Sequence, residues 1–256
     1  MYSLTDKIIW LTGASQGIGA ALCRELVSRG AKVAITARSK DLLYQIENEL
    51  TPQVRAFPGD VTDLAQMKNI SEEIESTLGP INMMIANAGS CFYINDDSFS
   101  SEACLSLMDL NYGGVLRCIE AVLPKMTERK DGVIVGVASL AGYRGLPRAS
   151  AYGATKAGLI HFLESFRFQL ARQGVAVTVV NPGFVKTPLT DKNNFPMPFL
   201  ITPERAAKYI CDGLERQKKE IAFPFGFTLF MKLMNFLPHC IYEKLVMFVW
   251  KKLNYV

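Results

Sequence analysis

The sequence is poor in the residues that build metal centres. It contains two histidines, His161 and His239, and no two of its six cysteines have C-x-x-C spacing. Zinc sites usually take their ligands from clusters of such residues, so we expect no metal ion. The charge bias is weak as well. The 28 lysines and arginines against 24 aspartates and glutamates leave a net charge of +4, which gives no reason to expect a nucleic-acid partner.

Signals for secretion or for an unfolded chain are missing too. Residues 1–13 do not combine a basic stretch, a long apolar stretch and a small-residue cleavage site, which predicts a reducing, cytoplasmic location. Hydrophobic residues make up 49% of the chain and charged residues 20%, which excludes a largely disordered or collagen-like protein. A length of 256 residues allows one domain or at most two small ones.

Short apolar runs alternate with longer amphipathic stretches through most of the chain. Several short runs are apolar throughout, which is typical of strands buried on both faces of a parallel sheet. The alternation predicts an α/β fold, a single doubly wound domain over residues 1–225 with a seven-stranded, mainly parallel sheet and helices on both faces. The predicted strands are 7–12, 32–36, 54–60, 81–87, 132–139, 175–183 and 220–225, and the predicted helices are 17–29, 40–50, 63–78, 100–127 and 152–173.

Two segments depart from this alternation. Residues 188–204 have no clear period and are long for a strand-to-helix connection, which indicates a lid. Residues 226–256 are unusually apolar, but charged residues keep both of their apolar runs below eighteen uncharged residues, so no membrane-spanning helix is expected. Pro238 predicts a break between two short helices. The interrupting residues are Lys232, Glu243, Lys244, Lys251 and Lys252.

Two environments suit this C-terminal extension. Its lysines and Trp250 are suited to the surface of a bilayer, which predicts a peripheral membrane contact through residues 226–256. The alternative is that the extension buries its apolar area against the domain or against a second subunit.

A glycine-rich loop, TGASQGIG at residues 12–19, follows the first predicted strand and opens the first predicted helix. Helix N-termini present unpaired N–H groups and partial positive charge, and glycines let the backbone turn and approach a pyrophosphate closely. The spacing is G-x-x-x-G-x-G and differs from the usual G-x-G-x-x-G. The loop indicates a nucleotide site, with a tight turn that binds nothing as the alternative.

The end of the second predicted strand discriminates between cofactors. An acidic residue there holds the ribose 2′-hydroxyl of NAD, whereas an arginine accommodates the 2′-phosphate of NADP. The sequence has Arg38 at this place, followed by Ser39 and Lys40, and no acid before Asp41. This favours NADP(H), with a solvated arginine as the alternative.

A serine, a tyrosine and a lysine have a spacing that suits proton transfer. Ser139 closes a predicted strand, and Tyr152 and Lys156 share one face of the following helix at positions i and i+4. A neighbouring ammonium lowers the pKa of a phenol, which can then exchange a proton with a carbonyl or alcohol oxygen, while Ser139 bonds the same oxygen. A Tyr-x-x-x-Lys pair alone is more often an ordinary surface pair.

Together these features resemble the short-chain dehydrogenase/reductase family. The resemblance covers about residues 5–225 and implies a Rossmann-like fold. The glycine loop departs from some NADP-preferring members, which carry a basic residue where this chain has Ser15 and Gln16, so Arg38 is the main argument for NADP(H). The motifs, in the family's order, are TGASQGIG (12–19), Asp60 in GDVTD, NAG (87–89), Asn111, Ser139, YGATK (152–156) and PGFVKTP (182–188).

The resemblance implies a role for each matching residue. The catalytic set would be Ser139, Tyr152, Lys156 and Asn111, with Asn111 supporting a water-mediated proton relay to the lysine. The alternative for Asn111 is a helix-interior asparagine bonded to a carbonyl group. The cofactor set would be Gly13, Ser15, Gln16, Gly17, Ile18 and Gly19 at the phosphates, Arg38 at the 2′-phosphate, Asp60 and Val61 at the adenine, Asn87, Ala88 and Gly89 on the ribose side, Tyr152 and Lys156 at the nicotinamide ribose, and Pro182, Gly183, Val185 and Thr187 at the nicotinamide.

The expected activity is hydride transfer between NADP(H), or alternatively NAD(H), and a small-molecule carbonyl/alcohol pair. The chain is expected to form a homodimer or homotetramer. Apolar residues in segments that flank the substrate in this family indicate an apolar or lipid-like substrate, unless they only pack the lid down. Three other functions stay open: a catalytically silent nucleotide-sensing protein, an NAD(P)-dependent epimerase or dehydratase, and a membrane scaffold. The flanking residues are Tyr143, Leu146, Phe195, Met197, Phe199 and Leu200.

Overall fold

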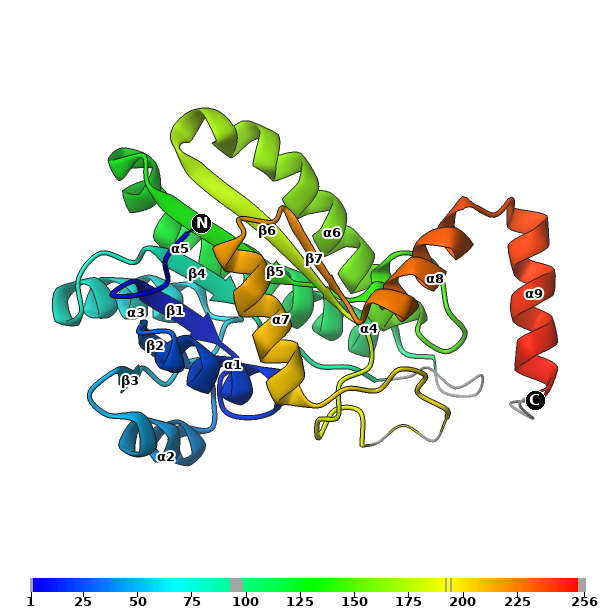
Figure 1. Ribbon diagram of the computed structural model, residues 1–256, viewed down its shortest axis with the longest axis horizontal. Helices are drawn as coiled ribbons and strands as arrows, with labels where there is room; N and C mark the ends of the chain where they lie inside the picture. The colour runs from blue at the N-terminus through cyan, green and yellow to red at the C-terminus, as the bar shows by residue number, and fades with distance from the viewer. Residues whose placement is uncertain (1, 93–98, 192, 194, 253–256) are drawn as a thin grey trace.

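A seven-stranded parallel sheet lies at the centre of the protein in the computed structural model (Figure 1). The structure describes residues 2–92, 99–191, 193 and 195–252. The strand order is β3-β2-β1-β4-β5-β6-β7, and every neighbouring pair is parallel. The predicted doubly wound α/β fold is therefore confirmed. The strands are β1 (Ile8–Thr12), β2 (Lys32–Thr36), β3 (Val54–Ala56), β4 (Met83–Ala86), β5 (Gly132–Val137), β6 (Val175–Pro182) and β7 (Glu220–Phe223).

The direction of strand addition reverses between β1 and β4, which places a crevice at their carboxyl ends. All five residues of β1 are buried, which explains why this strand is apolar throughout. Its one large polar group is satisfied, because Trp10 Nε1 donates a hydrogen bond of 2.9 Å to Thr36 Oγ1 on β2.

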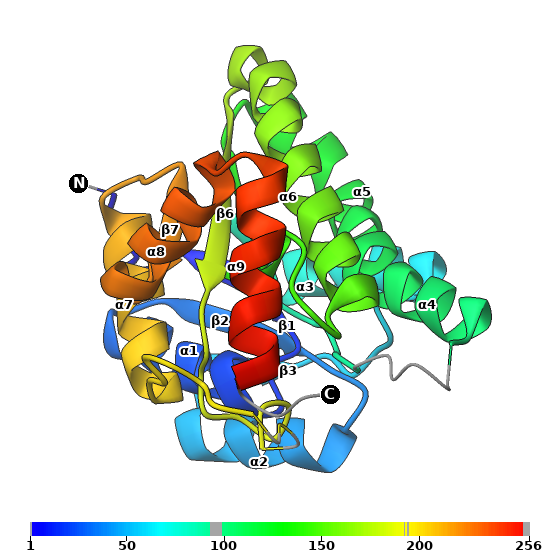
Figure 2. The same ribbon diagram turned by 90° about the vertical axis from the view of Figure 1, so that its right-hand side faces the viewer.

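Helices cover both faces of the sheet (Figure 2). On α1, Leu22 and Leu26 lie one turn apart and both point into the core. On the opposite face, Leu159 and Leu163 of α6 do the same. One face carries α1 (Gly17–Ser28), α2 (Lys40–Leu50) and α7 (Pro203–Glu215), and the other carries α3 (Leu64–Thr77), α5 (Gly114–Arg129) and α6 (Ser150–Leu170).

Most predicted elements differ from the structure by a few residues at their ends, and one predicted helix is divided. The predicted helix 100–127 is divided into α4 (Ser101–Met108), a π-helical segment η1 (Asp109–Gly113) and α5. The predicted strand 54–60 ends at Ala56, because Pro58 has no N–H group to continue the ladder. The predicted strand 81–87 is shortened to β4. Two short 3₁₀ turns, η2 (Leu140–Gly142) and η3 (Ala171–Gln173), flank α6.

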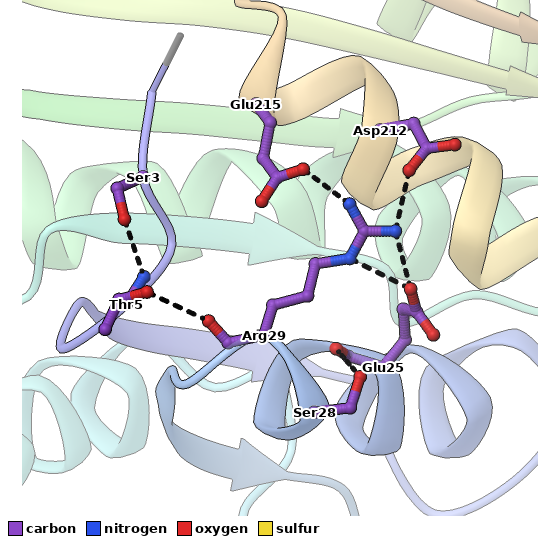
Figure 3. A network of polar contacts seen from close by, with 7 residues as sticks. All are labelled: Ser3, Thr5, Glu25, Ser28, Arg29, Asp212 and Glu215. Atoms are coloured by element: carbon purple, nitrogen blue, oxygen red, sulfur yellow. Dashed lines mark hydrogen bonds and ion pairs between the residues drawn. The ribbon is translucent and has the colours of Figure 1, made fainter.

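An arginine at the end of α1 fastens α7 against it (Figure 3). The Arg29 guanidinium donates to Glu25 Oε1 on its own helix, and to Asp212 Oδ1 at 2.7 Å and Glu215 Oε2 at 2.6 Å on α7. Burial alone would lower the pKa of Arg29, but these hydrogen bonds raise it, so the side chain stays charged. These ion pairs hold α1, the helix that begins within the glycine loop, against α7.

Two further helices, α8 (Phe225–Phe236) and α9 (His239–Lys252), follow β7. The predicted break at Pro238 is confirmed. In Figures 1 and 2 they lie beyond the end of the sheet, with α9 outermost. Within the described residues, no helix has the length and hydropathy needed to cross a membrane.

Candidate active site

A cleft of about 420 Å³ lies at the carboxyl ends of β1, β2 and β4. All eighteen residues that the sequence analysis assigned to a cofactor line this one cleft, although they come from segments spread over residues 13–187. They are Gly13, Ser15, Gln16, Gly17, Ile18, Gly19, Arg38, Asp60, Val61, Asn87, Ala88, Gly89, Tyr152, Lys156, Pro182, Gly183, Val185 and Thr187.

The glycine loop leaves no room for side chains on the inside of its turn. A Cβ atom on Gly19 would lie 2.1 Å from the carbonyl oxygen of Gly13, and one on Gly13 would lie 2.7 Å from Ala88 Cα. Asn87 Nδ2 donates to the carbonyl oxygens of Thr12 at 3.0 Å and Gly13 at 3.1 Å, which fixes the loop against the segment after β4. The turn therefore brings backbone, rather than side chains, to the cleft.

The amino terminus of α1 is suited to an anion. In the described part of the chain, no acidic residue lies in its first turn and no side chain caps it. The partial positive charge of the helix end is thus available to a pyrophosphate. The residues present fit a dinucleotide at this place.

Two polar groups mark the far end of the cleft. Arg38 is exposed just after β2 and lines the cleft together with Ser39. Asp60 lies after β3, where its Oδ1 accepts hydrogen bonds from the backbone N–H of Thr62 at 2.9 Å and from Thr62 Oγ1 at 2.8 Å. The first side chain offers a cation, whereas the second shapes the turn that closes the cleft.

Ser139, Tyr152 and Lys156 meet at the inner end of the cleft. Ser139 follows β5, and its Oγ accepts from the backbone N–H of Ala141 at 3.1 Å, which holds the hydroxyl at the start of η2. Tyr152 and Lys156 lie one turn apart on α6, with Lys156 Nζ 5.8 Å from the centroid of the Tyr152 ring. The predicted proximity of the phenol and the ammonium is therefore present.

Lys156 is held in an almost fully buried position. Its side chain is 5% exposed, and Nζ donates a hydrogen bond of 2.9 Å to the carbonyl oxygen of Val137. Burial lowers the pKa of Lys156 from 10.5 to about 8, because the charged form loses its hydration. The amine is therefore still mostly protonated at neutral pH and places a positive charge beside Tyr152.

A second, mostly apolar cavity of about 330 Å³ adjoins the cleft. Ser139 and Tyr152 line both, so the two hydroxyl groups lie where a polar and an apolar site meet. Such a junction can hold a carbonyl oxygen against two hydrogen-bonding groups while the rest of the molecule stays in apolar surroundings. The cavity wall also includes Cys91, Leu140, Leu146, Pro147, Arg148, Phe184, Phe195, Phe227, Phe230, Met231, Met234, Tyr242, Leu245 and Val246.

Comparison with known proteins decides the family. A family model described as short chain dehydrogenase matches residues 7–197. The chain belongs to the short-chain dehydrogenase family. An uncharacterized oxidoreductase of Myxococcus xanthus is 35% identical over 95% of this chain and 97% of its own length. A similar oxidoreductase of Staphylococcus aureus is 32% identical over 85% of this chain and 95% of its own length.

A solved structure of a short-chain dehydrogenase from Streptomyces avermitilis superposes with a TM-score of 0.81 at 25% identity, and covers 98% of both chains. The predicted family resemblance is therefore confirmed, and the protein is an oxidoreductase of this family, whose members bind NAD(P)(H). The match to the family model ends at residue 197, so α7, β7, α8 and α9 lie beyond it.

The fourth predicted catalytic residue of this dehydrogenase, Asn111, lies behind the cleft. It is fully buried in the π-helical segment η1. Its amide donates to the carbonyl oxygen of Ser90 at 2.9 Å and to Thr155 Oγ1 at 3.1 Å, and accepts from the backbone N–H of Ser90 at 2.8 Å. Asn111 thus ties the segment after β4 to the helix that carries Tyr152 and Lys156. The contact with the Ser90 carbonyl group agrees with the structural alternative for Asn111, and its proton-relay role stays a prediction.

The predicted substrate-side residues divide into two groups. Leu146 and Phe195 line the apolar cavity. Tyr143 does not, because its hydroxyl donates to Glu220 Oε1 on β7. Met197, Phe199 and Leu200 of the predicted lid also lie outside the cavity wall, so these four positions do not contact the cavity; packing of the lid was the alternative left open for the lid residues. Phe199 instead stacks on Phe227 with a centroid separation of 6.2 Å.

The C-terminal helices also contribute to this cavity, which was not predicted from the sequence. Phe227, Met231 and Met234 of α8 lie at helical spacing and all line it, as does Tyr242 of α9. The spacing was a readable signal, because a helix that follows the last parallel strand begins at the same sheet edge as the active site.

Proposed function

We propose that this dehydrogenase is an NADP(H)-dependent oxidoreductase that interconverts a carbonyl and a secondary alcohol on an apolar or lipid-like substrate. One observation carries the proposal: Ser139 and Tyr152 stand at the junction of the cleft and the apolar cavity, with the buried Lys156 beside them. We further propose that residues 1–225 form the catalytic domain and that residues 226–256 extend it.

The bound nicotinamide would supply the hydride to the carbonyl carbon, or accept it in the reverse direction. Tyr152 donates its hydroxyl proton to the carbonyl oxygen as that oxygen gains negative charge, and takes it back in the oxidation of the alcohol. Ser139 donates a hydrogen bond to the same oxygen. Lys156 favours the phenolate form of Tyr152 through its positive charge. Asn111 positions α6 beneath them.

The glycine loop would hold the pyrophosphate at the amino terminus of α1, and Asp60 with Val61 would lie at the adenine. Arg38 would bind the 2′-phosphate. This preference for NADP(H) over NAD(H) is supported by the exposed position of Arg38 on the rim of the cleft.

Arg38→Asp tests the cofactor preference. The substitution replaces a charge-assisted, bidentate contact with a repulsive carboxylate, so the KM for NADPH should rise about 10- to 100-fold. The KM for NADH should change little, because NADH has no 2′-phosphate. Steady-state kinetics with both cofactors measure the two effects.

Lys40→Asp is the matched control. It makes the same change of charge as Arg38→Asp, but Lys40 is exposed and does not line the cleft. It should raise the KM for NADPH only slightly, because it changes the charge near the 2′-phosphate without removing a contact to it, and it should leave the KM for NADH unchanged. An equal loss of NADPH and NADH affinity in Arg38→Asp would contradict a contact to the 2′-phosphate.

A panel of ketones and secondary alcohols, each offered with NADPH and NADH, tests the activity by nicotinamide absorbance. Apolar ketones should be reduced with NADPH. A dehydrogenase that turns over no member of the panel, yet binds NADPH, would favour the nucleotide-sensing alternative.

Location and assembly complete the proposal. All six cysteines lie in the described residues, and none of these six is in a disulfide, which supports a cytoplasmic, reducing location. Leu105 on α4 and Phe168 on α6 are 69% and 77% exposed, which supports their burial in a homodimer or homotetramer. Sedimentation velocity would measure the oligomeric state.

A further inference from the structure

The outer faces of α8 and α9 concentrate the exposed apolar surface of the protein. Of the sixteen large apolar side chains that are exposed in the described chain, nine lie between residues 225 and 248. A concentration of exposed apolar side chains in one segment is typical of a binding site for a protein or a membrane. We call these nine residues the apolar ridge: Phe225, Leu229, Phe230, Leu233, Phe236, Ile241, Leu245, Met247 and Phe248.

The charge of the same segment selects the partner. Residues 225–256 contain four lysines and one glutamate. Lys232 forms an ion pair of 2.5 Å with Glu220 on β7, so three lysines against one glutamate remain, which leaves the segment a net charge of +2. A second copy that packed through the same segment would bring an equal net positive charge with it, which opposes association. An anionic lipid surface complements both the apolar side chains and the charge.

The ridge is continuous with the substrate cavity. Phe230 and Leu245 are exposed on the ridge and also line the cavity, one from each helix. Within the described residues, no part of 225–248 lines the cofactor cleft. A polar cofactor and an apolar substrate therefore have separate approaches that meet at Ser139 and Tyr152. In Figure 2, α9 faces the viewer across the end of the molecule, with α8 beside it.

The helix pair is fastened to the loop that begins at Ser139. Arg144 Nη1 donates to the carbonyl oxygens of Met234, Asn235 and Leu237 at 2.8–3.0 Å, at the carboxyl end of α8. The same guanidinium lies 4.1 Å from the ring centroid of Tyr242 on α9. The Tyr242 hydroxyl donates to the carbonyl oxygen of Gly145 at 2.5 Å. A surface that held α8 and α9 would thus hold the mouth of the cavity.

We propose that the apolar ridge docks this dehydrogenase on an anionic lipid surface. We also propose that its substrate is a membrane-dissolved, long-chain carbonyl or alcohol that enters the cavity between α8 and α9; this second part rests on the proposed function. Both parts of the proposal rest on Phe230 and Leu245, which are exposed on the ridge and also line the cavity. The side chain of Trp250, which the sequence analysis placed at the interface, lies outside the described residues.

Co-sedimentation with lipid vesicles tests the docking. The full chain should bind vesicles of phosphatidylcholine with phosphatidylglycerol, bind phosphatidylcholine alone more weakly, and lose affinity as salt is raised. The double variant Leu233→Ser/Phe236→Ser should lose about tenfold or more of this binding, because both side chains would leave the lipid. They are 55% and 85% exposed and do not line the cavity.

Leu105→Ser/Phe168→Ser is the matched control, with the same two residue types at similar exposure on α4 and α6. It should bind vesicles as the parent does, whatever it does to the oligomeric state. Failure of the parent chain to bind, or unchanged binding of Leu233→Ser/Phe236→Ser, would overturn the docking. A third outcome would also overturn the docking: the parent chain forms a dimer that binds no vesicles, and Leu233→Ser/Phe236→Ser dissociates this dimer whereas the control does not. A second copy would then cover the ridge.

Turnover separates the docking from the activity. With NADPH, Leu233→Ser/Phe236→Ser should reduce a short, water-soluble methyl ketone at the parent rate and a vesicle-dissolved long-chain methyl ketone much more slowly. Equal rates on the vesicle-dissolved ketone would overturn the entry route. A parent chain that binds vesicles but reduces neither ketone would overturn the proposed function and the entry route, while the docking would be supported.

Discussion

Replacing Tyr152 by phenylalanine should lower kcat by about 10²- to 10⁴-fold, because the reaction loses its proton donor. The affinity for NADPH should stay close to that of the parent, since the ring remains on the wall of the cleft. Single-turnover kinetics with a ketone from the panel would measure the first effect, and titration of NADPH fluorescence the second.

Tyr143→Phe is the control for this experiment. Tyr143 lies between η2 and α6, its hydroxyl donates to Glu220, and it does not line the cavity. The variant should keep kcat near the parent value and lose some stability, because a partly buried hydrogen bond is removed. Near-parent turnover by Tyr152→Phe, or an equal fall in Tyr143→Phe, would contradict the assignment of Tyr152 as the proton donor.

Lys156→Met should abolish most of the turnover and change how stability depends on pH. The fall in kcat should be at least about 10²-fold, because Tyr152 loses the cation that favours its phenolate. Burial lowers the pKa of Lys156 to about 8, against 10.5 for an exposed lysine. Below pH 8 the side chain of Lys156 in the folded protein therefore carries a charge, and burial makes that charge unfavourable.

The sign of the stability effect follows from proton binding. Between pH 8 and pH 10.5 the unfolded chain binds more protons at Lys156 than the folded chain, so this residue makes the free energy of unfolding rise with pH. The full effect is about 3 kcal/mol, from 1.36 kcal/mol per pKa unit. Lys156→Met removes this dependence but also leaves the Val137 carbonyl oxygen without its hydrogen bond, a cost that does not vary with pH.

Urea unfolding of both proteins at pH 7 and pH 10 isolates the lysine. At pH 7, Lys156→Met should have a higher free energy of unfolding than the parent. At pH 10 the difference between the two free energies should be smaller by about 2 kcal/mol. Other titrating groups, such as the Cys118 thiol whose pKa burial raises to about 12, cancel in the difference between the two proteins. A difference that is the same at both pH values would contradict a buried, charged Lys156.

Local patterns in the sequence were sufficient to predict the strands and helices that carry the site. The strand 32–36 and the helix 40–50 have the bounds predicted for them, because β-branched runs and amphipathic repeats bounded by turn residues are decided over a few residues. The i, i+4 spacing of Tyr152 and Lys156 likewise implied a shared helix face, and α6 provides it. These features depend on backbone geometry that the neighbouring residues fix.

The lining of the substrate cavity was decided only by the tertiary structure. Met197 and Phe199 were predicted on the substrate side, yet Phe227 and Met231 of α8 occupy the wall that was expected of them. Asn111 needed a π-helical turn to reach Ser90 and Thr155, and a continuous helical pattern gave no sign of that turn. Contacts between segments far apart in the chain decide which surface an apolar side chain covers. Hydrophobic periodicity shows that a helix has an apolar face, but the pattern is the same whichever surface that face packs against.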